Sequence, residues 1–213
     1  MNDKRIRLIY DKLYSCFGPQ HWWPGDTPFE VIVGAILTQN TSWKNVSISI
    51  QNLKKNKVLT PRKLYIVPPE KLGLLIKSSG YYNLKAKRLK NFLECLFSEY
   101  KGGLRKMLGC EENILRRILL GISGIGPETA DSIMLYAGGK LSFVVDAYTR
   151  RIFTRHKFIK DDLSYDEIKG FFEKNLPPDI KLYNEYHALI VKLGKEFCLK
   201  KNPKCSLCPI KGI

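Results

Sequence analysis

The sequence predicts an all-α protein of roughly ten helices. Apolar residues recur at steps of three and four along most of the 213 residues, as they do on one face of a helix. Two segments, residues 27–30 and 164–167, carry a capping residue with a glutamate three positions later, which is a helix-start signature. No segment of the sequence shows the sustained apolar–polar alternation, bounded by turns, that is typical of paired strands.

The first half of the chain is predicted to form five helices, the first over residues 6–17. Thr27 caps the second helix, and Pro28 occupies its first position, where the missing N–H costs no hydrogen bond. The unbroken apolar run over residues 31–37 places this second helix at the centre of the core. Amphipathic spacing then predicts helices over residues 46–53, 72–76 and 83–100.

The second half of the chain continues the helical spacing over residues 114–119, and Pro127 opens a helix that extends to residue 137. Residues 142–145 fit either a short strand or an extended lead-in to a helix, and we favour the lead-in. A capping box at Ser164 starts a further helix, and the last one covers residues 182–197.

The charge balance points to a polyanionic partner. The chain has 36 Lys and Arg against 20 Asp and Glu, a net charge of +16, and nucleic acid is the commonest partner of such a surplus. A lysine-rich solvated surface is the alternative. The hydrophobic content of 44% supports a buried core, in one domain or two small lobes. No apolar run reaches the roughly 20 residues of a membrane span, and there is no signal-peptide core, so we expect a cytoplasmic protein.

Residues 119–131 contain the most specific local pattern, a glycine hairpin between two helices. Gly124 and Gly126 allow a sharp reversal, because glycine accepts positive φ without a Cβ clash, and Ile125 can pack against both helices. The amides of this turn converge beside the helix that Pro127 starts, which makes an anion site. On a chain of this charge we expect the anion to be a nucleic-acid phosphate, although a Gly-x-Gly turn alone would be ordinary.

Together with the segment that follows it, this hairpin resembles the helix-hairpin-helix DNA glycosylase superfamily. The pattern Leu-x-Gly-[Ile/Val]-Gly-x-x-[Ser/Thr]-Ala is present with Ile122 at the leucine position, and an apolar pair precedes Asp146 downstream. The resemblance covers nearly the whole chain. It implies a six-helix barrel lobe over residues 25–137 that contains the hairpin, and a second helical lobe, with a C-terminal cysteine loop, formed by residues 1–24 and 138–213.

The resemblance also implies a monomeric base-excision repair enzyme, associated with the nucleoid, that binds duplex DNA containing a damaged base. Hairpin residues would hold the phosphate backbone without reading sequence, namely Gly124, Ile125, Gly126 and Thr129. Asp146 would be the essential carboxylate, which stabilises the oxocarbenium-like sugar as the base leaves or deprotonates the nucleophile. A plain helix N-cap is the alternative role for this aspartate.

Glu128 separates two activities within the superfamily. Members that also nick the strand, such as endonuclease III, carry a lysine at this position, and its amine forms a Schiff base with the sugar. Glutamate cannot form an imine, and Lys140 lies in the following loop, so we expect a monofunctional glycosylase in which water is the nucleophile. The alternatives are an endonuclease III-like glycosylase and lyase acting on oxidised pyrimidines, and a helix-hairpin-helix protein that binds DNA without chemistry.

Four further segments fit one branch of the superfamily: residues 21–24, 36–43, 79–89 and 136–137 resemble 3-methyladenine DNA glycosylase III. The resemblance implies a pocket for an alkylated purine, lined by Trp22, Trp23, Pro24, Trp43 and Glu128. A flipped base stacks between aromatic faces, and alkylation makes the purine cationic, which strengthens the stacking. Core packing is the alternative for at least one of the tryptophans.

Polar residues near the hairpin are expected to contact DNA. Gln39 matches the wedge residue that fills the gap left by the extruded nucleotide, with an ordinary buried or capping glutamine as the alternative. Lys85, Lys87 and Arg88 form a basic cluster suited to phosphate, or else a solvated helix face. His187 lies on an apolar helical pattern and is expected to be structural.

Three cysteines near the end of the sequence form the pattern Cys198-x6-Cys205-x2-Cys208. The pattern matches the first three ligands of the iron–sulfur loop in endonuclease III-like proteins, Cys-x6-Cys-x2-Cys-x5-Cys, and so implies a [4Fe-4S] cluster. The fourth cysteine would fall immediately after Ile213, and we expect the natural chain to supply it there rather than to lack it. Zinc and free thiols are the alternatives, and some alkylpurine glycosylases of the same branch lack the cluster.

Overall fold

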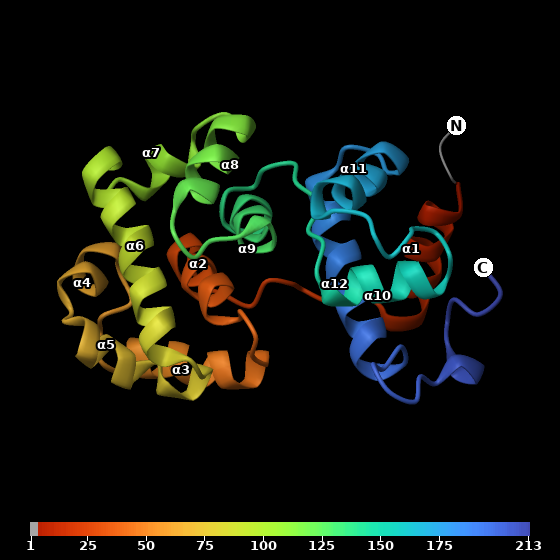
Figure 1. The fold of residues 1–213 in the computed structure, drawn as a ribbon, viewed down its shortest axis with the longest axis horizontal. Coiled ribbons are helices and arrows are strands. Elements are labelled where there is room, and N and C mark those ends of the chain that lie inside the picture. Colours follow the sequence, from red (N-terminus) through yellow and green to blue (C-terminus); the bar gives the residue numbers. More distant parts are fainter. Residues whose placement is uncertain (1–3) are drawn as a thin grey trace. The chain divides into compact units, whose positions relative to one another are not determined.

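The computed structural model describes residues 4–213, and all regular structure in this range is helical, which confirms the predicted all-α class. The chain forms two compact units (Figure 1). One unit consists of residues 23–140, and the other combines the segment up to Trp22 with residues 141–213. None of the described helices is long and apolar enough to cross a lipid bilayer.

The unit of residues 23–140 is built around α2 (Pro28–Leu37), in which every residue after the first is buried. Thr27 caps this helix, since its hydroxyl accepts a 3.1 Å hydrogen bond from Glu30 N. The helix packs against α3, α6, α9 and η2, so its predicted central place in the core is confirmed. The elements around it are α3 (Trp43–Lys55), α4 (Pro61–Ile66), α5 (Pro69–Leu75), η1 (Lys77–Ser79), α6 (Tyr82–Tyr100), α7 (Leu104–Leu108), α8 (Glu112–Gly121), α9 (Pro127–Ser132) and η2 (Ile133–Ala137).

Two features of this unit differ from the sequence-based expectation. Helices α4 and α7, of six and five residues, were not predicted. The single helix expected over residues 127–137 is instead α9 followed directly by the π-helical turn η2.

The other unit contains α1 (Lys4–Phe17), α10 (Ala147–Arg155), α11 (Tyr165–Asn175), α12 (Ile180–Glu196) and the short turn η3 (Cys205–Leu207). Helix α12 provides much of its core, with ten buried residues. Ser164 and Glu167 form the predicted capping box at the start of α11. Residues 142–145 are a buried, extended lead-in to α10 and not a strand, as expected.

Candidate functional site

Asp146 is the N-cap of α10, and only 11% of its side chain is exposed. Its Oδ1 accepts hydrogen bonds from Thr149 N at 2.7 Å and from Thr149 Oγ1 at 3.0 Å. A capping role is therefore correct for one carboxylate oxygen. The other oxygen, Oδ2, lies 3.6 Å from Nε2 of His187 on α12, whose side chain is also buried.

The carboxyl group of Asp146 is held in its ionised form. Burial alone would raise its pKa, but the His187 imidazole and the hydrogen bonds from Thr149 outweigh burial and lower the pKa below its usual value. Because water screens a buried charge poorly, this carboxylate can strongly stabilise a positive charge that develops beside it.

The contact between Asp146 and His187 was not predicted, since the apolar pattern around His187 indicated a purely structural role. The contact depends on the close packing of α10 against α12. A Cβ atom at Gly194 of α12 would lie only 2.9 Å from Cγ of Tyr148 of α10, so this approach relies on the glycine. Gly194 follows His187 by two helical turns and shares its face of α12. A histidine two turns before a glycine, within an apolar helix, was the only sequence signal for this arrangement.

The glycine hairpin connects α8 and α9 as expected. Gly124 has a φ of +95°, in the left-handed region that favours glycine, and Ile125 is buried in the core of its unit. Gly126 is the N-cap of α9 with a φ of −91°, so a positive φ is needed at Gly124 but not at Gly126. Glu128 is exposed in the first turn of α9.

Gln39 joins three segments of the same unit through its side-chain amide. Nε2 donates hydrogen bonds to Gly124 O at 3.0 Å and to Thr129 Oγ1 at 2.9 Å. Oε1 accepts a hydrogen bond from Nη1 of Arg88 on α6. Thr129 is itself buried, so its side chain supports the hairpin from the core side. The amide of Gln39 is thus tied to both the hairpin and α6.

The basic cluster on α6 does not form one surface. Lys85 is 1% exposed, and its ammonium donates a 2.6 Å hydrogen bond to Ser79 O. Burial and, to a smaller extent, the charge of Arg88 lower the pKa of Lys85 to about 8. The prediction that Lys85 contacts phosphate is therefore wrong, because the core encloses its side chain. Lys87 is exposed, as that prediction requires.

Two of the three tryptophans meet within the unit of residues 23–140. The rings of Trp23 and Trp43 pack edge to face with their centroids 5.2 Å apart, and Tyr136 lies 5.2 Å from Trp23. Both indoles cover Gly34 of α2, where an added Cβ would lie 3.2 Å from Nε1 of Trp23 and 3.3 Å from Cζ3 of Trp43. The three rings are half-buried, so this aromatic cluster (Trp23, Trp43 and Tyr136) is both anchored and partly accessible.

Trp22 belongs to the other unit, where the ammonium of Lys195 lies 5.9 Å from its ring centroid. Pro24 is exposed at the start of the segment that leads into α2. A place in a base pocket stays a prediction for these two residues, as it does for Trp23, Trp43 and Glu128.

The three C-terminal cysteines differ in exposure: Cys198 is buried, Cys208 half-buried and Cys205 exposed. Burial, together with the neighbouring Cys198 and Cys205 thiols, raises the pKa of Cys208. Arg155 Nη1 donates a 3.4 Å hydrogen bond to Sγ of Cys198. Within residues 4–213, no group of three or more His, Cys, Asp or Glu side chains is arranged to hold a metal ion. No chemical step proposed below depends on a metal centre.

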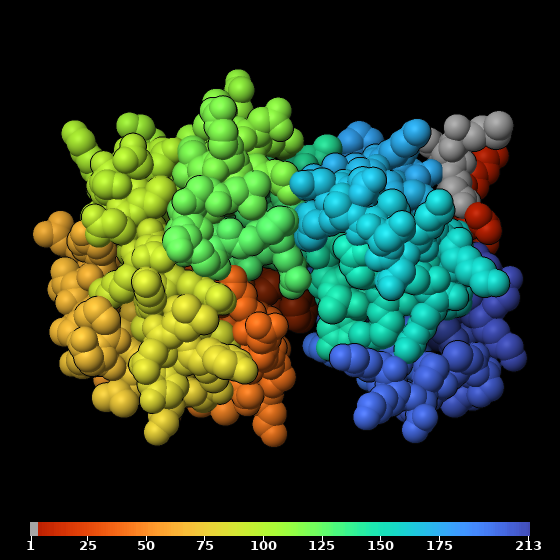
Figure 2. All heavy atoms as spheres, in the orientation of Figure 1, coloured from red at the N-terminus to blue at the C-terminus, as the bar shows by residue number. Residues whose placement is uncertain are grey.

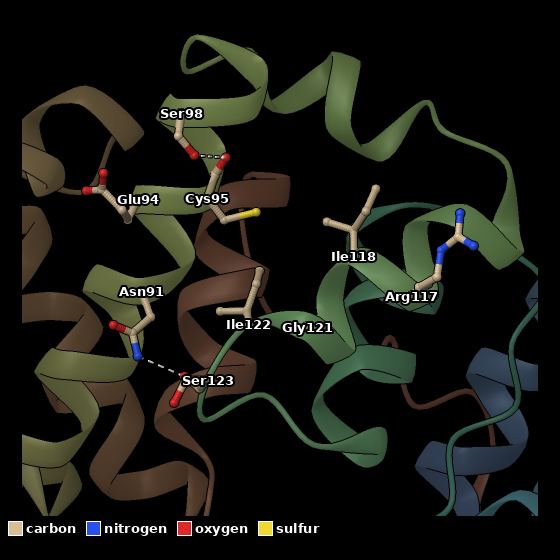
Figure 3. A pocket seen from close by; sticks show the side chains of 9 residues that line it. All are labelled: Asn91, Glu94, Cys95, Ser98, Arg117, Ile118, Gly121, Ile122 and Ser123. Atoms are coloured by element: carbon tan, nitrogen blue, oxygen red, sulfur yellow. Dashed lines mark hydrogen bonds between the residues drawn. The ribbon is translucent and has the colours of Figure 1, made fainter.

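A shallow groove of about 450 Å³ lies between α6 and α8 (Figure 3). It is lined by Asn91, Cys95, Ile118 and Ser123 among others, and it includes none of the predicted site residues. At its lower end Asn91 Nδ2 donates a 2.9 Å hydrogen bond to Ser123 O, the residue before Gly124. The groove therefore ends at the hairpin. Burial raises the pKa of the Cys95 thiol in this groove and so disfavours the reactive thiolate.

Comparisons with known proteins agree with the geometry. Residues 33–178 match the HhH-GPD superfamily base excision DNA repair protein family. The chain is 51% identical to MJ1434 of Methanocaldococcus jannaschii, which is named provisionally as a DNA repair glycosylase, over 99% of this chain and 97% of that protein.

Two solved structures share the fold. The H. pylori 3-methyladenine DNA glycosylase MagIII, bound to 1,N6-ethenoadenine, has a TM-score of 0.79 and 30% identity over 89% of this chain and 97% of its own. A non-covalent endonuclease III–DNA complex has a TM-score of 0.83 and 25% identity over 98% and 93% of the two chains. The resemblance inferred from the sequence is confirmed: the chain belongs to the HhH-GPD superfamily of base excision DNA repair proteins and is a DNA repair glycosylase of that family.

Proposed function

We propose that this protein is a monofunctional DNA glycosylase that hydrolyses the N-glycosidic bond of an alkylated purine flipped out of duplex DNA. The observation that carries the proposal is the buried, ionised carboxylate of Asp146 at the start of α10. Departure of the base leaves positive charge on the sugar, which a fixed carboxylate in a poorly solvated site stabilises. The same carboxylate can accept a proton from the attacking water.

Glu128 supports hydrolysis without strand nicking. It occupies the hairpin position where a lyase of this superfamily would need its imine-forming lysine, and a carboxylate cannot form an imine. Water is therefore the nucleophile, and the product is a free base with an intact strand containing an abasic sugar.

The aromatic cluster supports an alkylated purine as the substrate. A purine alkylated at a ring nitrogen such as N3 or N7 carries positive charge and stacks favourably on electron-rich rings, which Trp23, Trp43 and Tyr136 provide. A related protein, the H. pylori 3-methyladenine DNA glycosylase, has been solved with the modified purine 1,N6-ethenoadenine bound. This similarity supports a modified purine as the substrate here.

The hairpin and the positive charge of the chain support duplex DNA as the partner. Backbone amides around Gly124 and Gly126, together with the exposed ammonium of Lys87, would contact phosphates. Such contacts position the duplex and leave lesion selection to the flipped base. Action as a monomer, and in association with the nucleoid, stays a prediction.

Chromatography of the bases released from alkylated DNA tests the proposal, and we expect free alkylated purines. Borohydride trapping on the same duplex should yield no covalent adduct, because Glu128 replaces the lysine that would form the reducible imine. A robust adduct would support the endonuclease III-like lyase instead, and release of oxidised pyrimidines in place of purines would exclude the proposed substrate.

Replacing His187 with glutamine should move the acid limb of the pH–rate profile to higher pH. In the wild type the pKa of Asp146 is lowered, so activity is lost only as the pH falls through this low value. Without the imidazole the effect of burial dominates, and the pKa of Asp146 rises. Single-turnover excision rates measured between pH 4 and 8 give the shift of the acid limb.

His156→Gln is the matched control for His187→Gln, because His156 lies at the C-terminal end of α10, away from the Asp146 cap. Its acid limb should stay at the wild-type pH. An unchanged acid limb in His187→Gln would show that His187 does not influence the carboxylate.

A [4Fe-4S] cluster held by Cys198, Cys205 and Cys208 stays a prediction of the sequence pattern. The similarity to endonuclease III supports it, whereas the described geometry offers no formed metal centre. If bound, the cluster would fix the backbone of the C-terminal loop, and the proposed hydrolysis requires no electron transfer from it.

A further inference from the structure

Helix α6 holds the hairpin at two successive residues. Asn91 of α6 donates a hydrogen bond to Ser123 O (Figure 3), and Arg88, one turn earlier on the same helix, lies against Gly124. In Figure 2 the atoms of α6 and those of the segment near residue 120 are in direct contact on the visible face. The conformation of the hairpin is therefore supported from α6 as well as from within.

The stem of Arg88 fills the space that a side chain at Gly124 would need. A Cβ built on Gly124 would lie 3.0 Å from Cδ and 3.1 Å from Nε of Arg88. Nε of Arg88 is itself buried and has no hydrogen-bond partner among the residues that the structure describes. An arginine used only to attract phosphate would keep its guanidinium in solvent, where it retains its hydrating water and pays no desolvation cost.

The guanidinium of Arg88 also determines the orientation of the Gln39 amide. A glutamine amide offers two N–H donors and one oxygen, and Gln39 uses both kinds of group. Its nitrogen faces Gly124 O and Thr129 Oγ1, and its oxygen faces Arg88 Nη1. Since a guanidinium can only donate, Arg88 allows one of the two amide orientations and stabilises the bonds to the hairpin.

We propose that Arg88 is a positioning residue that locks Gln39 onto the hairpin, and that it is not a phosphate ligand. By holding the loop of Gln39 and the turn at Gly124 together, it preassembles one surface before the duplex arrives. Preassembly removes the cost of ordering these segments on binding, so the effect of Arg88 is independent of salt. The inference rests on the proposed function only in that this surface faces DNA.

The test compares Arg88→Met, which keeps most of the stem and removes the guanidinium, with Lys87→Met, which removes the same charge from the adjacent exposed position. Duplex affinity is measured over a range of salt concentrations. For Arg88→Met we expect affinity to fall severalfold at every concentration, with the wild-type slope of log K against log [salt]. A phosphate ligand lost at Lys87 should instead reduce that slope by about one.

Gln39→Leu breaks the same contact from the other side without removing a charge, and it should reproduce the salt-independent loss. The double variant should bind no worse than Gln39→Leu alone, because Gln39→Leu already removes the contact with Arg88 along with the hydrogen bonds to Gly124 and Thr129. Excision should fall by about tenfold to a hundredfold in each, the range expected for losing a hydrogen bond to a charged group. Thermal melts confirm that each variant is folded.

A slope reduced by about one in Arg88→Met, or additive losses in the double variant, would overturn the proposal. Binding to undamaged duplex keeps this test separate from the proposed activity. If the wild type released no alkylated purine, the function would fail, while the salt slopes would still decide the role of Arg88.

Discussion

Asp146→Asn should reduce excision by about a hundredfold to a thousandfold while duplex affinity stays near the wild-type value. The asparagine keeps the shape of the side chain, and its amide oxygen can still accept the two hydrogen bonds from Thr149 that form the cap. Only the negative charge is lost, and with it the stabilisation of the sugar cation. Single-turnover excision and direct binding to the same duplex measure the two effects separately.

Asp179→Asn is a matched control for this substitution. Asp179 caps α12 as Asp146 caps α10, accepting hydrogen bonds from Lys181 N and Leu182 N, but it is exposed and takes no part in the proposed chemistry. Its substitution should leave excision unchanged and affect stability slightly. Near-normal turnover in Asp146→Asn would refute the assignment of the carboxylate and favour a protein that binds DNA without chemistry.

Trp43→Ala should impair excision by about tenfold to a hundredfold at subsaturating DNA, and affect binding to undamaged duplex far less. Base stacking on an aromatic ring contributes roughly 1 to 3 kcal/mol, and only a flipped base can use it. Duplex affinity comes from phosphate contacts elsewhere. The variant should also lose discrimination between alkylated and normal purines, since a cationic base gains most from the ring. Rates on both kinds of duplex measure this.

Trp23→Ala and Trp22→Ala extend the test, with Trp43→Phe as the variant that retains a ring. Because Trp23 and Trp43 cover Gly34 of the central helix α2, thermal melts must accompany the assays to separate a lost stacking partner from a loosened core. If the three alanine variants stay folded and excise alkylated purines normally, none of the three tryptophans holds the base.

The parts of the protein that the sequence determined by itself are those whose partners lie within one helical turn. The caps at Thr27, Asp146 and Ser164 join positions three residues apart, so the residue types alone reveal them. The hairpin is likewise a contiguous motif, because glycine, an apolar plug and Pro127 dictate its backbone locally. These short-range signals were sufficient for the all-α class and for the family.

Neighbouring residues on α6 show that short-range sequence signals do not predict which side chains of a helix are buried. Lys85, Lys87 and Arg88 form one basic cluster in the sequence, yet successive residues of a helix are rotated by about 100°, so the three side chains enter different surroundings. Lys85 lies in the core, Lys87 in solvent and Arg88 against the hairpin. Which side of α6 is buried depends on the helices packed around it, and not on α6 alone.

Only the tertiary structure decided the partners that are distant in sequence. Gln39 bonds Thr129, 90 residues away, and Asp146 lies beside His187 on another helix. Such pairs form because whole helix faces pack together, and the approach of α10 to α12 at Gly194 is one example. Many pairings of apolar helix faces satisfy the same sequence pattern. The charge state of Asp146 depends on which pairing the protein adopts, because burial raises the pKa of this carboxyl group and the neighbouring imidazole lowers it.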